Sequence, residues 1–515
     1  MAYVAPNSTV QLFGDINLSD NYHDSLYFPD TATKDSYFDA LPKLANAPAM
    51  SYTREQRGYV RIQRYMSDVY TARYMRYKNT SFENKWFYAF VKDVEYINNM
   101  CTQINFELDP LMTWMGEFNN HLAQCFVERQ HSTTDAVGDN IVEENLDIGD
   151  YVYNSISRSN KLGSTYTIII GASVDQNGAS ITGGQMVNNI YSGIALHQFG
   201  TMEAANAWIA QLTADAKSNA IVACVMCPSK FITDQQAVTE VFTVPKNLSY
   251  IDGYAPRNKK LFTYPYNYLV VTNGEGNFAT FRYEFWRASS TNCSFSIGGV
   301  AGLEPEVVLT PSQYKGSAQN LFNYAEKIVL NGFPHCAFNI DQYKAFLAQN
   351  WSTVQFEGAS TLASGVLNTV TGFVTGGLSG GVREGMHAAK EIGSIMAFHN
   401  DYKRKPTQAN GNTTTNFASS RREKDFWFLK QSITREYAAI IDDYFTMFGY
   451  AQKCVMTPNM NARPNYTYVK TVGCEVGGAI PADDASAIET IFDNGIRFWK
   501  NHSNIGNYSV NNDPS

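Results

Sequence analysis

Residues that could carry chemistry are thinly spread over this sequence of 515 residues. Cys224 and Cys227 form a CxxC pair, which could bind zinc beside a second ligand pair, or act as a redox site if it opened a helix. The sequence offers neither context, because the pair ends an apolar stretch and precedes a proline. We therefore predict that both cysteines are buried structural thiols.

Adjacent carboxylates are the other candidates, and they occur at Glu143–Glu144, Asp442–Asp443 and Asp483–Asp484. Neighbours on a helix point about 100° apart, so Asp442 and Asp443 are not expected to converge on a substrate. We expect solvated faces or turns at all three pairs. Gly274 and Gly276 lack the strand-to-helix context of a phosphate-binding loop and are expected to be turn residues. The sequence thus predicts no catalytic residue, no metal site and no cofactor.

The composition argues against a protein that coats nucleic acid and favours a β-rich protein with protein interfaces. The chain has 40 Lys plus Arg and 48 Asp plus Glu, a net charge of −8, which argues against a protein that coats nucleic acid by neutralising phosphates. Only 17% of residues are charged while 14% are aromatic, a balance typical of β-structure and of protein interfaces. Eight scattered cysteines and a start without the features of a secretory signal favour free thiols in a reducing cytoplasm.

Periodicity predicts the elements that would position these residues. Residues 57–109 alternate with a period of two, which indicates an antiparallel β domain. Residues 166–227 indicate a strand–helix–strand unit whose helix is capped by Thr201 and buries Ala205, Ile209 and Leu212. A hairpin is expected around NGEGN at 273–277, and helices over 341–357 and from Ser432, as N-cap, to Gly449.

The most unusual stretch is Ala359–Val382, which has no charged residue and six glycines. As a helix of 24 residues it would extend about 36 Å, enough to cross a hydrocarbon core of about 30 Å. Apolar residues would occupy one arc and hydroxyl and amide residues the other, with glycines at GxxxG spacing between them. The alternative is a flexible loop that only fills space, since each glycine disfavours a helix in water by about 1 kcal/mol.

Three strings resemble a known family: ENKWFYAFVKDVEYINNMCTQINFELDPLMTWM, LFTYPYNYLVVTNGEGN and TIFDNGIRFWKNHSNIGNYSVNN. They resemble the distal tail knob proteins of small short-tailed, protein-primed bacteriophages, the podoviruses of the Salasmaviridae and Rountreeviridae type. The resemblance implies a virion protein made in the bacterial host cytoplasm and placed in the tail. It implies a homo-hexamer that contacts other tail proteins, including the upper tail tube, and lets genomic DNA pass without specific binding. We expect the tube wall that faces the DNA to be neutral or acidic.

The resemblance also implies that an apolar loop at about 358–398 plugs the lumen and crosses the host cell membrane. The residues that would do so are Gly365, Val366, Leu367, Val370, Gly372, Phe373, Val374, Gly376, Leu378 and Gly380. We expect this segment to be non-helical in the free tube and helical only in lipid. A secreted pore-forming protein and a tail-tip wall hydrolase are the alternatives, but the first should carry an export signal and the second a catalytic motif.

The predicted fold is mainly β with α+β insertions, as a multi-domain, tail-tube or hub-like protomer of a hexameric ring with a Gly-rich apolar loop. The predicted domains are an N-terminal β tube domain (1–150), a strand–helix–strand insertion (151–250), a β-hairpin domain (251–340), a helix with the plug loop and a polar spacer (341–420), and a C-terminal helix with short strands that complete the tube domain (421–515).

Overall fold

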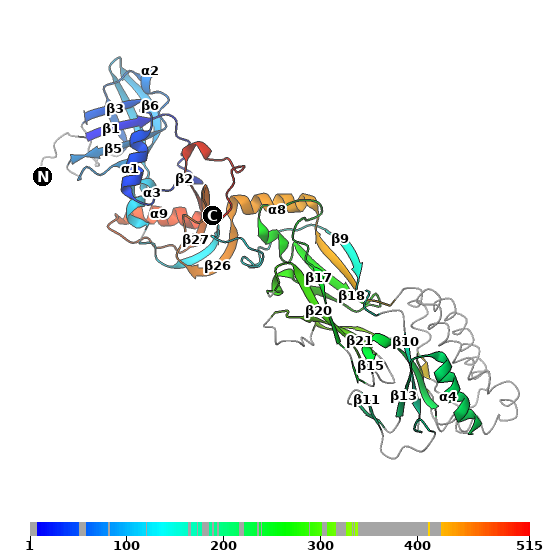
Figure 1. Cartoon of the computed structure of the whole chain (residues 1–515). Coiled ribbons are helices and arrows are strands. Elements are labelled where there is room, and N and C mark those ends of the chain that lie inside the picture. Colours follow the sequence, from blue (N-terminus) through cyan, green and yellow to red (C-terminus); the bar gives the residue numbers. More distant parts are fainter. Residues whose placement is uncertain are drawn as a thin grey trace, which may run out of the picture. The chain divides into compact units, whose positions relative to one another are not determined.

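The computed structural model is mainly β and forms two compact units (Figure 1). Unit 1 consists of Met1–Gly149, Gly253–Leu261 and Arg435–Ser515, and unit 2 of Asp150–Asp252 and Phe262–Thr434. The residues that the structure describes are 8–50, 58–80, 83–119, 121–162, 166–172, 174–177, 185–187, 190–192, 195–215, 221–233, 236–237, 239–287, 289–300, 306–315, 326–331, 333, 335–337, 410–411 and 424–514. The helix predicted over 341–357 lies outside them, and the division into five domains stays a prediction.

The first sheet of unit 1 has six strands in the order β3-β1-β5-β6-β7-β4, all antiparallel to their neighbours. The strands are β1 (Ser8–Phe13), β3 (Ala45–Met50), β4 (Tyr59–Ile62), β5 (Tyr74–Asn79), β6 (Phe87–Asn98) and β7 (Cys101–Leu108). Helices α1 (Thr31–Ala40), α2 (Met66–Val69) and α3 (Pro110–Phe118) belong to the same part of the chain. The antiparallel β domain predicted for 57–109 is confirmed, and β1 and β3 extend its sheet.

The second sheet of unit 1 joins distant parts of the chain. Its order is β2-β28-β27-β8-β26, in which only β2 and β28 run parallel. The strands are β2 (Asp24–Leu26), β8 (Cys125–Gln130), β26 (Tyr450–Met456), β27 (Tyr466–Val472) and β28 (Ile496–Trp499). Helices α8 (Arg435–Phe448) and α9 (Ala482–Asn494) complete the unit. A core rich in aromatic side chains, including Phe13, Phe38, Tyr74 and Trp499, packs between elements from both ends of the sequence.

Unit 2 contains three larger sheets around one core cluster. The first has the order β13-β10-β14-β23-β24, from β10 (Tyr166–Ala172), β13 (Ala195–Phe199), β14 (Ile221–Pro228), β23 (His335–Ala337) and β24 (Asn410–Gly411). The second is β17-β20-β21-β22, from β17 (Thr239–Pro245), β20 (Asn292–Val300), β21 (Glu306–Ser312) and β22 (Ile328–Leu330). The third is β19-β18-β25-β9, from β9 (Tyr151–Arg158), β18 (Asn267–Thr272), β19 (Phe278–Phe281) and β25 (Trp427–Ile433). Helix α4 (Met202–Ala214) follows β13.

Several local predictions for unit 2 are confirmed. The Thr201 hydroxyl accepts a hydrogen bond of 3.3 Å from the amide of Ala204 and caps α4, whose Ala205, Ile209 and Leu212 are buried. Strands β18 and β19 form the expected hairpin, and Gly274 and Gly276 take φ angles of +72° and +98° in its turn. Cys224 is buried within β14, so the CxxC motif lies in a strand and does not open a helix.

The predicted start of α8 is wrong, whereas its predicted end is confirmed. Ser432 is still in β25, where it pairs with Val152, and the helix begins only at Arg435 because Ile433 continues the strand pairing. At the other end, Gly449 has a φ of +64° and its amide donates to the Phe445 carbonyl at 2.8 Å. A Cβ atom there would lie 2.4 Å from the amide nitrogen of His131, so the site requires glycine.

Candidate functional site

All ten residues predicted to form the plug or membrane segment lie outside the described residues. Their role stays a prediction. Among the helices that the structure does describe, none is both long and apolar enough to span a membrane. In the same parts of the chain, no group of three or more His, Cys, Asp or Glu side chains is arranged to hold a metal ion.

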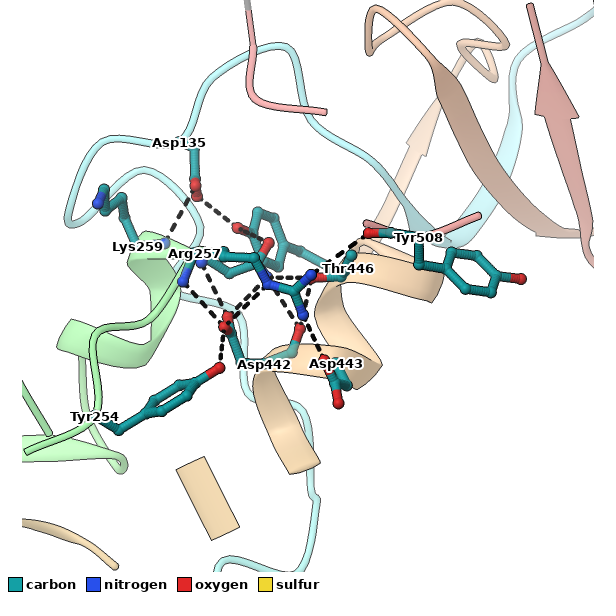
Figure 2. Close-up of polar contacts among 10 residues, drawn as sticks. Asp135, Tyr254, Arg257, Lys259, Asp442, Asp443, Thr446 and Tyr508 are labelled. Carbon is teal, nitrogen blue, oxygen red and sulfur yellow. Dashed lines mark hydrogen bonds and ion pairs between the residues drawn. The ribbon is translucent and has the colours of Figure 1, made fainter. Parts of the chain in front are cut away.

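The main polar cluster of unit 1 surrounds Asp442 of α8, which has no exposed side-chain surface (Figure 2). Its Oδ2 accepts from the Tyr254 hydroxyl at 2.8 Å and the Arg257 amide at 2.9 Å. Its Oδ1 accepts from the amide and the side-chain Nδ2 of Asn258, at 2.9 and 2.8 Å. Because a carboxylate accepts about four hydrogen bonds, these donors satisfy it completely. Asp442 therefore holds the segment Gly253–Leu261 against α8 and presents nothing to a substrate.

Arg257 connects the buried carboxylate to its exposed neighbour. Its Nε lies 3.5 Å from Asp442 Oδ2, and its Nη2 pairs with Asp443, whose side chain is 60% exposed. The two carboxylates do face different environments, as the helical geometry predicts, but the long guanidinium side chain reaches both. The prediction of a solvated face is correct for Asp443 and wrong for Asp442, because the segment Gly253–Leu261 covers that part of α8.

The prediction of a solvated face or turn is also wrong for Glu144, whose carboxylate is buried. Its side chain is fully buried and forms ion pairs with Arg129 and Lys260, and it accepts a hydrogen bond of 3.0 Å from the amide of Ala451. Arg129 also donates to the carbonyl of Gly449 at 2.6 Å. At the third carboxylate pair, Asp484 accepts a hydrogen bond of 2.9 Å from the Trp114 indole, and the bond joins α9 to α3.

Two further buried groups have strongly shifted pKa values without forming a catalytic arrangement. Burial raises the pKa of Asp109 to about 6, although its carboxylate caps α3 by accepting from the Met112 amide at 3.0 Å and from the Tyr74 hydroxyl at 2.8 Å. Burial lowers the pKa of His131 to about 3, and the charge of Arg463 acts in the same direction. The imidazole is therefore neutral, with Nδ1 accepting from the Tyr468 amide and Nε2 donating to the Thr446 carbonyl.

The outer surface of unit 1 carries large apolar side chains at the tip of the β6–β7 hairpin. Tyr96, Ile97 and Met100 are 54%, 37% and 51% exposed. Tyr65 and Tyr70, which flank α2, are also exposed. Tyrosine and methionine are enriched in protein interfaces, so this hairpin tip has the character of an assembly surface rather than of a substrate site.

Two families of phage tail proteins match this chain. The family described as the C-terminal domain of tail knob protein gp9 of Bacillus phage phi29 matches residues 228–513, which is more than half of the chain. The chain belongs to this family of phage tail knob proteins. The family described as the caudoviral major tail protein N-terminus matches residues 6–119, a range that includes the six-stranded sheet of unit 1.

The alignments with tail knob relatives cover the whole chain. The sequence is 24% identical to tail knob protein gp9 of Bacillus phage B103 and 23% identical to that of Bacillus phage phi29, with 100% of each chain covered. The solved structure of the tail knob protein gp12 of bacteriophage C1 shares the fold, with a TM-score of 0.64, 16% identity and coverage of 98% of this chain and 99% of that one.

The tail knob family confirms the sequence-based identification and the mainly β fold. The chain is a structural protein of a bacteriophage tail, is located in the virion tail, is made in the host cytoplasm and associates with other tail proteins. The relatives are named as tail knob proteins, which agrees with a non-enzymatic role.

Proposed function

We propose that six copies of this tail knob protein form a ring-shaped tube at the tail tip, through which the genome leaves the virion. The observation that carries the proposal is the match of residues 6–119 to the N-terminus of major tail proteins, together with the tail knob family match over 228–513. Repeated head-to-tail contacts between identical subunits close into a ring when the rotation is a fraction of a full turn.

The hairpin tip of β6 and β7 supports the ring, because its apolar side chains would be covered by a neighbouring subunit. The test is the mass of the purified assembly and its appearance under the electron microscope, for the native chain and for a variant with Tyr96→Ser and Met100→Ser. We expect rings from the native chain and smaller species from the variant. Tyr250→Ser is the control, since Tyr250 is 58% exposed but belongs to unit 2. A native chain that stays monomeric at high concentration contradicts the proposal.

We propose in addition that residues 358–398 plug the tube and enter the host cell membrane. The support is the absence of charge from Ala359–Val382 and its division into an apolar arc and a hydroxyl-bearing arc. Deletion of Ser360–Phe398 should leave the ring assembled but abolish dye release from liposomes. A deleted ring that releases dye as well as the intact protein contradicts the membrane role.

Point substitutions sharpen that test because they leave the length of the segment unchanged. Val370→Asn with Phe373→Asn places polar groups on the apolar arc, and we expect it to reduce dye release severalfold, since amides are costly in hydrocarbon. Thr371→Ala with Thr375→Ala changes the opposite arc and should preserve release. Equal effects of the two variants would show that the arcs are not distinguished by lipid.

Passage of DNA without specific binding is the third part of the proposal. A net charge of −8 per chain offers little attraction to phosphates, and a basic lining would hold DNA by many contacts. We expect the assembled protein to retain no duplex DNA on a filter at physiological salt. Retention that weakens steeply with added salt would indicate a basic lining and contradict this part of the proposal.

A further inference from the structure

A cavity of about 360 Å³ in unit 1 has no role in the function proposed above. Its wall includes Arg463, Arg257, Lys259 and His131, and the segment 509–513 near the C-terminus. The volume falls at the small end of the range of ligand-binding sites, about 300 to 1,000 Å³. It is large enough for a small molecule rather than only for ordered water.

The distinctive group in this cavity is the guanidinium of Arg463. Arg463 is only 5% exposed, and its Nη1 donates to the Asn512 carbonyl at 3.3 Å. Its Nε and Nη2 are buried and have no hydrogen-bond partner, and no carboxylate among the described residues forms an ion pair with it. A buried guanidinium whose N–H groups lack acceptors is costly, so an anion that accepts from Nε and Nη2 would stabilise it.

The other charged groups of the cavity wall do not pair with Arg463. Arg257 is already paired with Asp442 and Asp443. His131 is neutral, because its ring accepts at one nitrogen and donates at the other. Asp513, the one carboxylate named in the cavity wall, is exposed and forms no ion pair with Arg463. Asp135 interacts electrostatically with Arg463, but its carboxylate accepts from the Tyr450 hydroxyl and the Lys259 amide, so Nε and Nη2 of Arg463 still have no acceptor.

The wall near the C-terminus is fixed in place. Asn512 Oδ1 accepts from the amides of Asn465 and Tyr466 at 2.9 and 3.2 Å, and its Nδ2 donates to the Tyr466 carbonyl at 2.9 Å. These three side-chain bonds hold the segment 509–513 beside the start of β27. The cavity is therefore formed before any ligand enters, which lowers the cost of binding.

We propose that this cavity binds an oxyanion, a phosphate or carboxylate group of a small molecule, through the Nε and Nη2 of Arg463. These two nitrogens form one edge of the planar guanidinium, and their parallel N–H bonds match two oxygens of a carboxylate or phosphate. Lysine cannot reproduce this paired geometry, because its ammonium is a single point charge.

The test is the melting temperature of the full chain at pH 7.5 with inorganic phosphate, glycerol 1-phosphate or sodium acetate, each against potassium chloride at equal ionic strength. We expect at least one oxyanion to raise the melting temperature of the native chain, because a ligand that binds only the folded state stabilises it. Stabilisation by glycerol 1-phosphate alone identifies an esterified phosphate, by both phosphates a free phosphate group, and by acetate a carboxylate. No stabilisation by any of the three overturns the proposal.

Variants of Arg463 assign the effect to the cavity. Arg463→Gln should abolish the oxyanion-dependent shift, and Arg463→Lys should weaken binding in calorimetry by about tenfold or more. The matched control is Arg64→Gln, because Arg64 is an exposed arginine of unit 1 outside the cavity. If Arg463→Gln does not fold, the comparison of Arg463→Lys with the native chain decides. An oxyanion effect that is the same in the native chain and in the Arg463 variants contradicts the proposal.

Discussion

The substitution Asp442→Asn tests whether the buried carboxylate of α8 stabilises unit 1. The native carboxylate accepts four hydrogen bonds from Tyr254, Arg257 and Asn258, two at each oxygen. Asparagine keeps one oxygen, so two donors then face an amide NH₂ group. The Tyr254 hydroxyl can rotate and accept, but a backbone N–H cannot. At about 1 to 3 kcal/mol for a buried donor without an acceptor, and with weaker bonds to a neutral oxygen, we expect a loss of about 2 to 4 kcal/mol.

The assay is urea denaturation of the full chain, followed by circular dichroism, with Asp443→Asn as the matched control. Asp443 has the same type of side chain, is adjacent in the helix and pairs with the same arginine, but it is 60% exposed. An exposed ion pair contributes about 0 to 1 kcal/mol, so the control should lose far less than Asp442→Asn. Losses of equal size in the two variants, or a loss below about 0.5 kcal/mol in Asp442→Asn, would refute the reasoning.

Three further predictions concern stability. The pKa of Asp109 in the folded protein, about 6, lies above its ordinary value of 3.8, so the carboxyl group binds more protons in the folded state and its contribution to stability falls as pH rises from about 4 to 6. Relative to the native chain, Asp109→Asn should therefore have a higher melting temperature at pH 7.5 than at pH 4. A difference in melting temperature that is the same at both pH values would contradict this. Gly449→Ala should lower the free energy of unfolding by at least about 1 kcal/mol more than Gly473→Ala, because both residues have φ near +65° but only at Gly449 would a Cβ atom meet backbone atoms. Urea denaturation should show this difference, and equal losses in the two variants would exclude the steric cause. Thr201→Ala should cost about 1 kcal/mol in thermal unfolding through loss of the α4 cap, and Thr201→Ser should recover most of it.

Local structure was predictable where neighbouring residues decide it. The alternating pattern of 57–109 gave antiparallel strands, because a half-buried strand places every second side chain in the core. Thr201 as N-cap and Gly449 as helix end were also predictable, since capping involves residues within one turn. The start of α8 was not, because whether Ile433 continues a strand depends on Tyr151, far away in the sequence.

The family, the β-rich character and the uncharged segment Ala359–Val382 could be inferred without a structure, because they depend on short sequence strings and on composition. The folded structure was needed to reveal that Asp442 and Glu144 are buried, that β8 and β27 are neighbours, and that Arg463 lines a cavity and has two nitrogens without a hydrogen-bond partner. Burial and hydrogen-bond partners depend on contacts between distant segments; Asn258 and Asp442, for example, are 184 residues apart. A charged residue in a single sequence looks the same whether another segment covers it or water does.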